Sequence, residues 1–176
     1  MLLAVAIPPS QAEAVDRDDA TLFGFFDDPS TLSQTLMFGL RARGGEAALL
    51  FSCDAEKQFF GGLVVPNVDP NDLGNAVRVT GANGRERAFR GRAIEVPGQM
   101  QFDGAAARGA YFISGPDNLR MRFPANMRFI GAVLEPGPVS IEIVNGAEPA
   151  RFIFETAPHL ELVERVANHC DRTIGQ

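Results

Sequence analysis

Two cysteines, Cys53 and Cys170, are the residues of this 176-residue chain with the most definite chemistry. Cys53 falls on the apolar side of an alternating stretch at 47–54, and Cys170 falls on the apolar stripe of a helical pattern at 156–172. Both thiols are therefore expected to point into the core, where they would form a disulfide in an oxidising compartment. The alternative is a pair of separate buried thiols.

The other groups with catalytic potential do not form a recognisable site. His159 and His169 lie ten residues apart on one expected helix and project about 80° apart, so they are not expected to bind one metal ion together. Ser114 is followed by glycine but lacks the preceding glycine of a nucleophile elbow. We expect capping or surface roles for the two histidines.

Asp69, Asn71 and Asp72 resemble part of a calcium-binding loop, but the remaining ligand positions and the terminal glutamate are missing. A turn rich in Asn and Asp is the expected structure. The segment Gly81 to Gly84 is too short for a phosphate-binding loop and lacks its lysine. No pair of carboxylates is singled out for glycosidic chemistry. The sequence therefore predicts a protein that is not an enzyme and that has no metal or cofactor.

One local run of positive charge stands out on a chain whose net charge is −6. Its arginines, together with two that follow later, are candidates for partner binding: Arg85, Arg87, Arg90, Arg92, Arg120 and Arg122. Together they would form a basic face for an acidic protein, an anionic glycan or lipid headgroups. The simpler interpretation is a solvated face without a partner. The acidic balance of the whole chain argues against nucleic acid as a ligand, because such proteins usually carry a basic surplus.

The N-terminal residues indicate export. Leu2 to Ile7 is a short apolar run, and Ala12 and Ala14 occupy the positions that a signal peptidase reads. The positive beginning of such a signal is absent, so residues 1–14 match a truncated signal peptide, or the likeness is chance. No run approaches the ~20 apolar residues of a transmembrane helix. We expect a periplasmic or secreted protein.

Residues 15–32 are acidic but contain phenylalanines, and we expect this segment to dock on a single β-rich domain at 33–172. Alternating apolar patterns and turn signals predict strands at 33–43, 47–54, 58–65, 76–80, 85–92, 99–102, 110–114 and 119–123 and a hairpin at 139–154. The strand at 85–92 is expected at an exposed sheet edge.

Two helices complete the expected fold. Met127, Ile130 and Leu134 share one face of a short helix near 125–135. Leu160, Val163, Ala167 and Cys170 form the stripe of the C-terminal helix, which is expected to pack on the sheet. The fold class is therefore mainly β (α+β): an antiparallel β-sandwich or an open barrel with these two helices.

The order of these elements resembles small periplasmic proteins of proteobacteria, notably the type VI secretion-associated VasI family and the invasion-associated locus B family. The resemblance rests on the segment Ala48-Leu-Leu-Phe-Ser-Cys53, the helix at 125–135, the strand pair around Asn145-Gly146 and the helix that ends at Cys170. It spans about residues 33–170 and implies a sandwich-like periplasmic fold with an accessory, non-catalytic role. It assigns no site residues.

Three functions follow as hypotheses. The first is an exported accessory or binding protein that contacts another envelope protein, with an association with envelope or secretion machinery as its narrower form. The second is a periplasmic enzyme inhibitor similar to lysozyme inhibitors, with the segment from Tyr111 to Pro116 as its inserted loop. The third is a hydrolase whose site is unrecognised.

Overall fold

The computed structural model describes residues 21–28, 33–54, 56–95, 101–102, 105–106, 109–115 and 119–172. Side chains are described from residue 35 onward, except those at 55, 96–108, 116–124 and 173–176. Among the described residues, no helix is long and apolar enough to cross a membrane.

The fold is built mainly from antiparallel strands. Its strands are β1 (Thr21–Asp28), β2 (Ser33–Arg41), β3 (Ala48–Cys53), β4 (Phe59–Pro66), β5 (Ala76–Thr80), β6 (Glu86–Glu95), β7 (Gln101–Phe102), β8 (Ala105–Ala106), β9 (Gly109–Ser114), β10 (Pro138–Ile143) and β11 (Arg151–Glu155). Nine of them form one sheet in the order β1-β2-β3-β4-β9-β6-β5-β10-β11, and β7 pairs with β8 in a separate hairpin.

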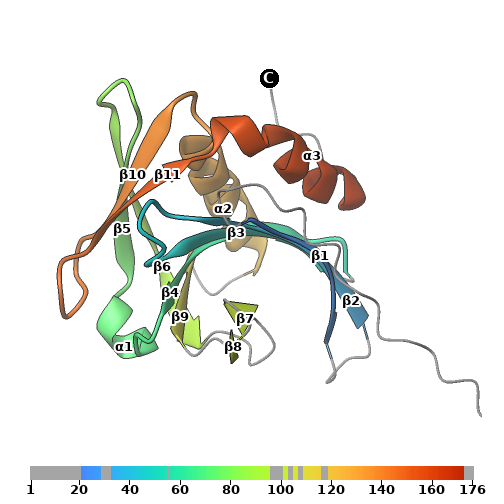
Figure 1. Cartoon of the computed structure of the whole chain (residues 1–176), viewed down its shortest axis with the longest axis horizontal. Helices are drawn as coiled ribbons and strands as arrows, with labels where there is room; N and C mark the ends of the chain where they lie inside the picture. Colours follow the sequence, from blue (N-terminus) through green and yellow to red (C-terminus); the bar gives the residue numbers. More distant parts are fainter. Residues whose placement is uncertain are drawn as a thin grey trace, which may run out of the picture.

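The sheet curls into an open barrel (Figure 1). The last strand of the sheet, β11, approaches the residues that follow β2 near the other end of the sheet. There the Arg43 N–H donates to the Ile153 carbonyl of β11 at 2.8 Å. The side chains of Arg43 and Glu155 form an ion pair at the same place. The open barrel is therefore the correct one of the two predicted architectures.

The helices cover one face of the curved sheet. They are α1 (Pro70–Leu73), α2 (Leu119–Val133) and α3 (Leu160–His169), and a short 3-10 helix, η1 (Ala157–His159), precedes α3. Helix α2 packs on β4 and β9, and α3 packs on β2 and β3 (Figure 1). The core between helices and sheet contains fully buried rings, including Phe38, Phe51, Phe112 and Phe129. These phenylalanines have no polar group to satisfy, which suits a dry interior.

Two adjacent glycines of β4 permit close packing on both faces of the sheet. A Cβ at Gly61 would lie 2.7 Å from Ile130 Cγ1 of α2, and a Cβ at Gly62 would lie 2.1 Å from Tyr111 Cε2. Larger residues would therefore push α2 away on one face or displace the Tyr111 ring on the other.

A disulfide joins Cys53 of β3 to Cys170 after α3, with the two Cα atoms 5.7 Å apart. Both cysteines are buried. Close by, Lys57 Nζ donates a hydrogen bond to the His169 carbonyl at 2.7 Å. The predicted disulfide is confirmed, and it fixes the C-terminal helix to the sheet.

Three details differ from the prediction. The strand predicted at 119–123 is wrong, because these residues form the first part of α2. Five alternating residues are too few to separate a strand from a helix. Leu160 was expected to face the core but is 36 % exposed, whereas Val166 is fully buried. Leu160 directly follows the 3-10 turn η1, which has fewer residues per turn than an α-helix. It therefore departs from the predicted stripe, whose other members Val163, Ala167 and Cys170 are buried.

The third difference concerns β6, which among the described residues is an edge strand over its first half only, on the side that faces away from β5. It lies between β9 and β5 in the sheet. Each neighbour, however, pairs with only half of it: β5 pairs with Glu86 to Arg90, and β9 pairs with Gly91 to Glu95. A Cβ at Gly91, where the neighbours change, would lie 2.0 Å from the Ile113 carbonyl oxygen, so the close approach of β9 requires glycine there.

Candidate binding groove

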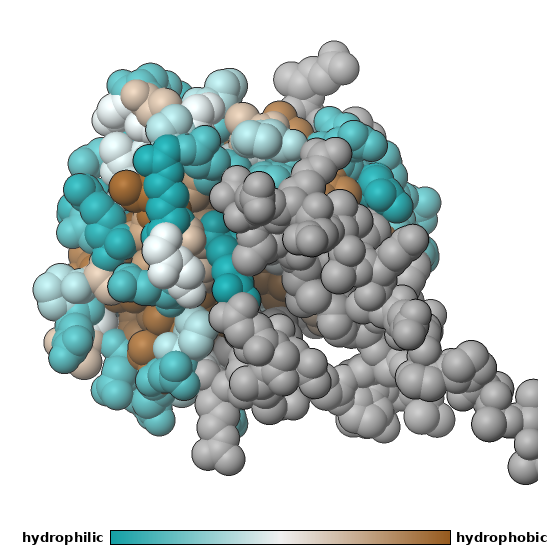
Figure 2. All heavy atoms as spheres, in the orientation of Figure 1, coloured by the Kyte–Doolittle hydropathy of each residue, from teal (hydrophilic) through white to brown (hydrophobic). Residues whose placement is uncertain are grey.

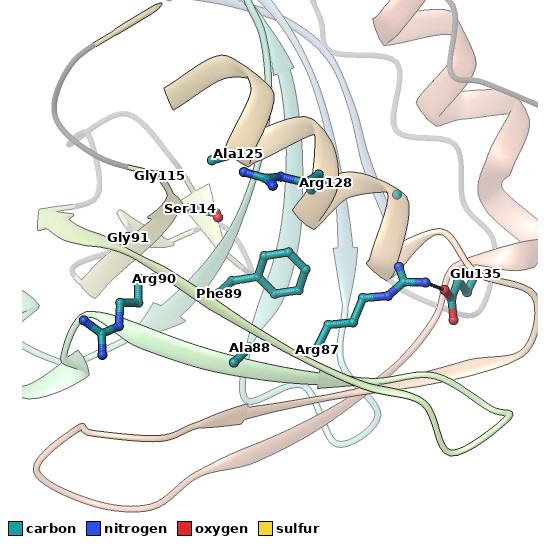
Figure 3. A pocket seen from close by; sticks show the side chains of 11 residues that line it. Arg87, Ala88, Phe89, Arg90, Gly91, Ser114, Gly115, Ala125, Arg128 and Glu135 are labelled. Atoms are coloured by element: carbon teal, nitrogen blue, oxygen red, sulfur yellow. Dashed lines mark hydrogen bonds and ion pairs between the residues drawn. The ribbon is translucent and has the colours of Figure 1, made fainter. Parts of the chain in front are cut away.

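An open groove of about 840 Å³ lies between strand β6 and helix α2 (Figure 3). Residues from β6, the end of β9, and α2 with the residues that follow it line the groove: Arg87, Ala88, Phe89, Arg90, Gly91, Ser114, Gly115, Ala125, Arg128, Gly131 and Glu135. The fold thus brings together a strand, the end of its neighbour and a helix that is separate in sequence.

The helix wall presents one face of α2. Ala125, Arg128 and Gly131 follow at intervals of three residues, which places them on the same side of a helix. Two of the three are small, and no heavy atom lies within 4 Å of the position of a Cβ at Gly131. Among the described side chains of α2, Arg128 is therefore the only long one on this wall, and it extends over the groove in Figure 3.

Asn126 holds this helix wall in place. Its side chain is fully buried. Its Oδ1 accepts a hydrogen bond from the Gly61 N–H at 2.8 Å, and its Nδ2 donates to the Gly61 carbonyl at 2.7 Å. The β4–β9 ladder stops at Gly62, so these two Gly61 groups lie just beyond its last pair. Asn126 therefore replaces the missing strand partner and fixes α2 against β4.

The strand wall has an aromatic floor. Arg87, Phe89 and Gly91 alternate along β6 on the side that faces α2. The Phe89 ring is half-buried and packs edge-on against Phe129, with ring centroids 5.5 Å apart. This arrangement offers an apolar surface in the middle of a groove whose rim is charged.

Among the described residues, the charge at the groove is positive: Arg87, Arg128 and Glu135 face it, and Arg90 borders it with a side chain on the opposite face of β6 (Figure 3). Arg87 and Glu135 form an ion pair at one end (Figure 3). Arg90 and Arg128 are exposed, and no acidic side chain in the described part of the chain pairs with either. Because the whole protein carries a charge of −6, this is a local reversal of sign.

The six predicted arginines do not form a single patch. Arg87 faces α2, whereas Arg90 and Arg92 lie on the opposite side of β6, as strand alternation requires. Arg85 is exposed in the turn before β6. Arg120 and Arg122 lie on α2, but their side chains are outside the described residues.

Sequence reasoning missed Phe89, Asn126, Arg128 and Glu135 as site residues. A weak signal existed for one of them: Arg128 stands between two small residues on one face of the predicted helix. Nothing in the sequence indicated which strand would face that helix.

The residues first considered for catalysis lie elsewhere. His159 is buried beside Phe38, with ring centroids 6.0 Å apart. His169 is the last residue of α3. Asp69 caps α1, because its Oδ1 accepts from the Asn71 N–H at 2.8 Å. Among the described residues, no three His, Cys, Asp or Glu side chains are grouped to hold a metal ion.

The segment considered as an inhibitory loop is a central strand. Tyr111 and Phe112 belong to β9, which pairs with β4 on one side and with β6 on the other. Tyr111 is 7 % exposed and packs with Leu50 and Val64 in a small cluster on the sheet face opposite α2. A strand held on both sides does not extend into the active site of another protein.

Tyr111 gives a spectroscopic test of this placement, because it is the only tyrosine and the chain has no tryptophan. Burial raises the pKa of its hydroxyl, and the neighbouring Ser52 hydroxyl offsets only a smaller part of this shift. The folded protein should therefore show no phenolate absorbance near pH 10, the usual pKa of tyrosine, whereas the urea-unfolded chain should titrate there. Above pH 10 the unfolded chain releases this proton and the folded protein does not. The contribution of Tyr111 to the stability of the fold is therefore complete below pH 10 and is lost as the pH rises further. Phenolate formation near pH 10 in the folded protein would place Tyr111 at the surface instead.

Large exposed apolar residues are few in the described chain, with two at the β10–β11 hairpin and one at the start of α3. Val144, Ile153 and Leu160 are the exposed large hydrophobic residues of the described chain. The described part of the face in Figure 2 is mainly hydrophilic, with separate apolar spots. The groove is therefore the stronger candidate for a binding site.

Comparisons of this chain with protein-family models, with curated proteins and with solved structures found no match.

Proposed function

We propose that this protein is a non-catalytic, exported accessory protein of the bacterial envelope, and that it binds another envelope protein through the groove between β6 and α2. The observation that carries the proposal is the groove itself: an open volume of about 840 Å³ with an aromatic floor, Arg128 over it and Arg90 on the reverse face of its border strand, both exposed and without an acidic partner among the described residues. Such a mixture of apolar and positively charged surface favours an acidic partner.

The chemistry of the lining favours binding over catalysis. Ser114 is the only hydroxyl group among the lining residues, and no histidine accompanies it. Glu135, the one carboxylate, is engaged by Arg87. A serine nucleophile needs an adjacent base that is free to take its proton, and the described lining offers none.

Export is supported by the disulfide and by the N-terminal pattern. Cys53 and Cys170 are 117 residues apart and both are buried, so the bond is part of the core. Disulfides of this kind persist in the periplasm and outside the cell, where thiols are oxidised. The resemblance to periplasmic accessory proteins points to the same compartment, and an association with secretion machinery follows from it.

The alternatives receive less support. An inhibitor of lysozyme type would need an exposed inserting loop, whereas residues 111–114 of its candidate segment belong to β9 and Pro116 lies outside the described residues. A hydrolase would need converging catalytic groups that the groove lining does not provide.

A matched pair of variants tests the proposal. In the groove variant, Arg90→Gln and Arg128→Gln remove the two exposed charges that border the groove and that no described acidic side chain pairs with. In the control, Arg85→Gln and Arg151→Gln remove two exposed charges outside the groove lining. The three immobilised proteins are exposed to envelope extract, and bound proteins are quantified by mass spectrometry after cross-linking. We expect one or a few acidic envelope proteins to bind the wild type and the control and to lose at least tenfold in recovery on the groove variant. Equal recovery on all three proteins would contradict the proposal.

A further inference from the structure

Strand β6 has an open edge that lies in the groove. Its first half pairs with β5, and β9 runs beside only its second half. The last contact with β9 is the hydrogen bond from the Gly115 N–H to the Arg90 carbonyl at 2.8 Å. From Phe89 back toward Glu86, no described residue pairs with the edge of β6 that faces away from β5. Among the described residues, none occupies the position next to Glu86 to Phe89, which we call the vacant lane of the sheet.

The ladder geometry identifies the backbone groups that face this lane. In an antiparallel pair, the N–H and C=O of successive residues point alternately to one neighbour and to the other. The Gly91 N–H donates to Asn75, and the Arg85 carbonyl accepts from Gly81, both on the β5 side. Residues 85, 87, 89 and 91 therefore bond toward β5. It follows that the N–H and C=O of Ala88, which lies between them, point into the vacant lane.

The opposite wall of the lane is α2, and its face leaves room for a chain. Ala125 and Gly131 have little or no side chain, and the groove is open above Gly131. A strand edge that faces a helix across an open groove is the arrangement in which proteins bind an extended peptide as an added strand.

We propose that the groove binds a short, extended acidic segment of a partner protein, which pairs with the backbone of Ala88 as an added β-strand. This inference rests on the proposed function and names the form of its ligand. Side chains of an added strand alternate between the two sheet faces. On one face they would meet Phe89 and Arg128, and on the other they would lie beside Arg90. Acidic side chains are favoured on both faces, and an apolar side chain is favoured over the Phe89 ring.

The arginines determine which strands are accepted. Charged side chains along an open edge normally prevent strands of other proteins from adding to it. Arg90 and Arg128 would repel a basic segment and attract an acidic one. The edge would therefore bind acidic strands and not strands in general.

The first experiment uses a fluorescent heptapeptide of alternating glutamate and valine, titrated against the purified protein at two salt concentrations. Two variations of the probe separate the contributions of charge and of backbone pairing. A peptide with lysine in place of glutamate tests charge, and a peptide with every backbone nitrogen methylated keeps its charges but cannot complete the ladder. We expect binding of the first peptide and at least tenfold weaker binding of the other two. Equal binding of the methylated peptide would overturn strand addition, since charge alone would then explain the affinity.

The second experiment removes the donor from the protein. Ala88→Pro eliminates the N–H that faces the lane without removing a bond to β5, and proline is tolerated at such open-edge positions. Ala88→Ser at the same site is the matched control. We expect at least a tenfold loss of peptide affinity for Ala88→Pro and wild-type affinity for Ala88→Ser. Wild-type affinity of a folded Ala88→Pro protein would overturn the proposal.

Amide hydrogen exchange on the wild-type protein gives a result that does not depend on the folding of the variant. The Ala88 amide should exchange at least tenfold faster than the Arg87 and Phe89 amides in the free protein and should slow on addition of the peptide. Protection of Ala88 in the free protein would overturn the inference. If the peptide fails to bind while the groove-dependent capture of an envelope protein persists, strand addition is wrong and the proposed function stands. Loss of both would reject both.

Discussion

Replacing both cysteines by alanine should lower the free energy of unfolding by about 5 kcal/mol, the value that the chain-entropy model gives for a loop of slightly over a hundred residues. Cys53 and Cys170 are separated by 117 residues, so the bond removes much of the freedom of the unfolded chain. For a protein of this size, each kcal/mol changes the Tm by about 2–4 °C, which gives a fall of roughly 10–20 °C.

Urea denaturation and thermal melting of the double variant measure this effect, and a reducing agent supplies the control. The wild type in strong reductant should approach the stability of the double variant, whereas the variant should not respond to reductant. The expected loss of stability comes from the missing covalent bond alone, because Val163, Val166 and Ala167 still pack against the sheet in the double variant. A double variant within 1 kcal/mol of the oxidised wild type would show that α3 is held by packing alone.

Asn126→Leu should destabilise the protein by about 2–5 kcal/mol, because it leaves two buried backbone groups without partners at about 1–3 kcal/mol each. The groups are the N–H and C=O of Gly61, which bond to the Asn126 side chain and lie beyond the end of the β4–β9 ladder. The change also removes the contact that positions α2, and with it the helix wall of the groove.

The matched control is Asn168→Leu, since Asn168 is exposed on α3 and a surface change of this type is usually within about 0.5 kcal/mol. Urea titration of both variants gives the two free energies. Asn126→Asp adds a further comparison, because the aspartate keeps an acceptor for the Gly61 N–H but has no donor for the carbonyl. A loss below 0.5 kcal/mol for Asn126→Leu would mean that the two hydrogen bonds do not fix α2.

Much of the fold was predictable because its signals are local. The alternation of Leu49, Phe51 and Cys53 predicted the buried face of β3, and all three are fully buried. The Asn-Gly turn predicted the β10–β11 hairpin. The cysteine pairing was predictable because the chain has only two cysteines and each falls on an apolar face. In these cases a short stretch of sequence determines where its own side chains point.

The groove was not predictable in the same way, because it depends on contacts between distant segments. The arginine run at 85–92 was noticed, but the local pattern does not state that β5 and β9 each cover half of that strand. Asn126 looks like an ordinary polar residue in a helix, and its role depends on Gly61, 65 residues away. Gly91 marks the change of neighbour only once the position of Ile113 is known.

The proposed binding of an acidic strand has one direct measurement: backbone NMR shift mapping of the ¹⁵N-labelled protein with the glutamate–valine heptapeptide. The account predicts that the large shift changes fall on residues 86–90 of β6, on Ser114 and Gly115 at the end of β9, and on α2 from Ala125 onward. Changes centred on another surface, such as the β10–β11 hairpin with Val144 and Ile153, or no saturable change at all, would contradict it.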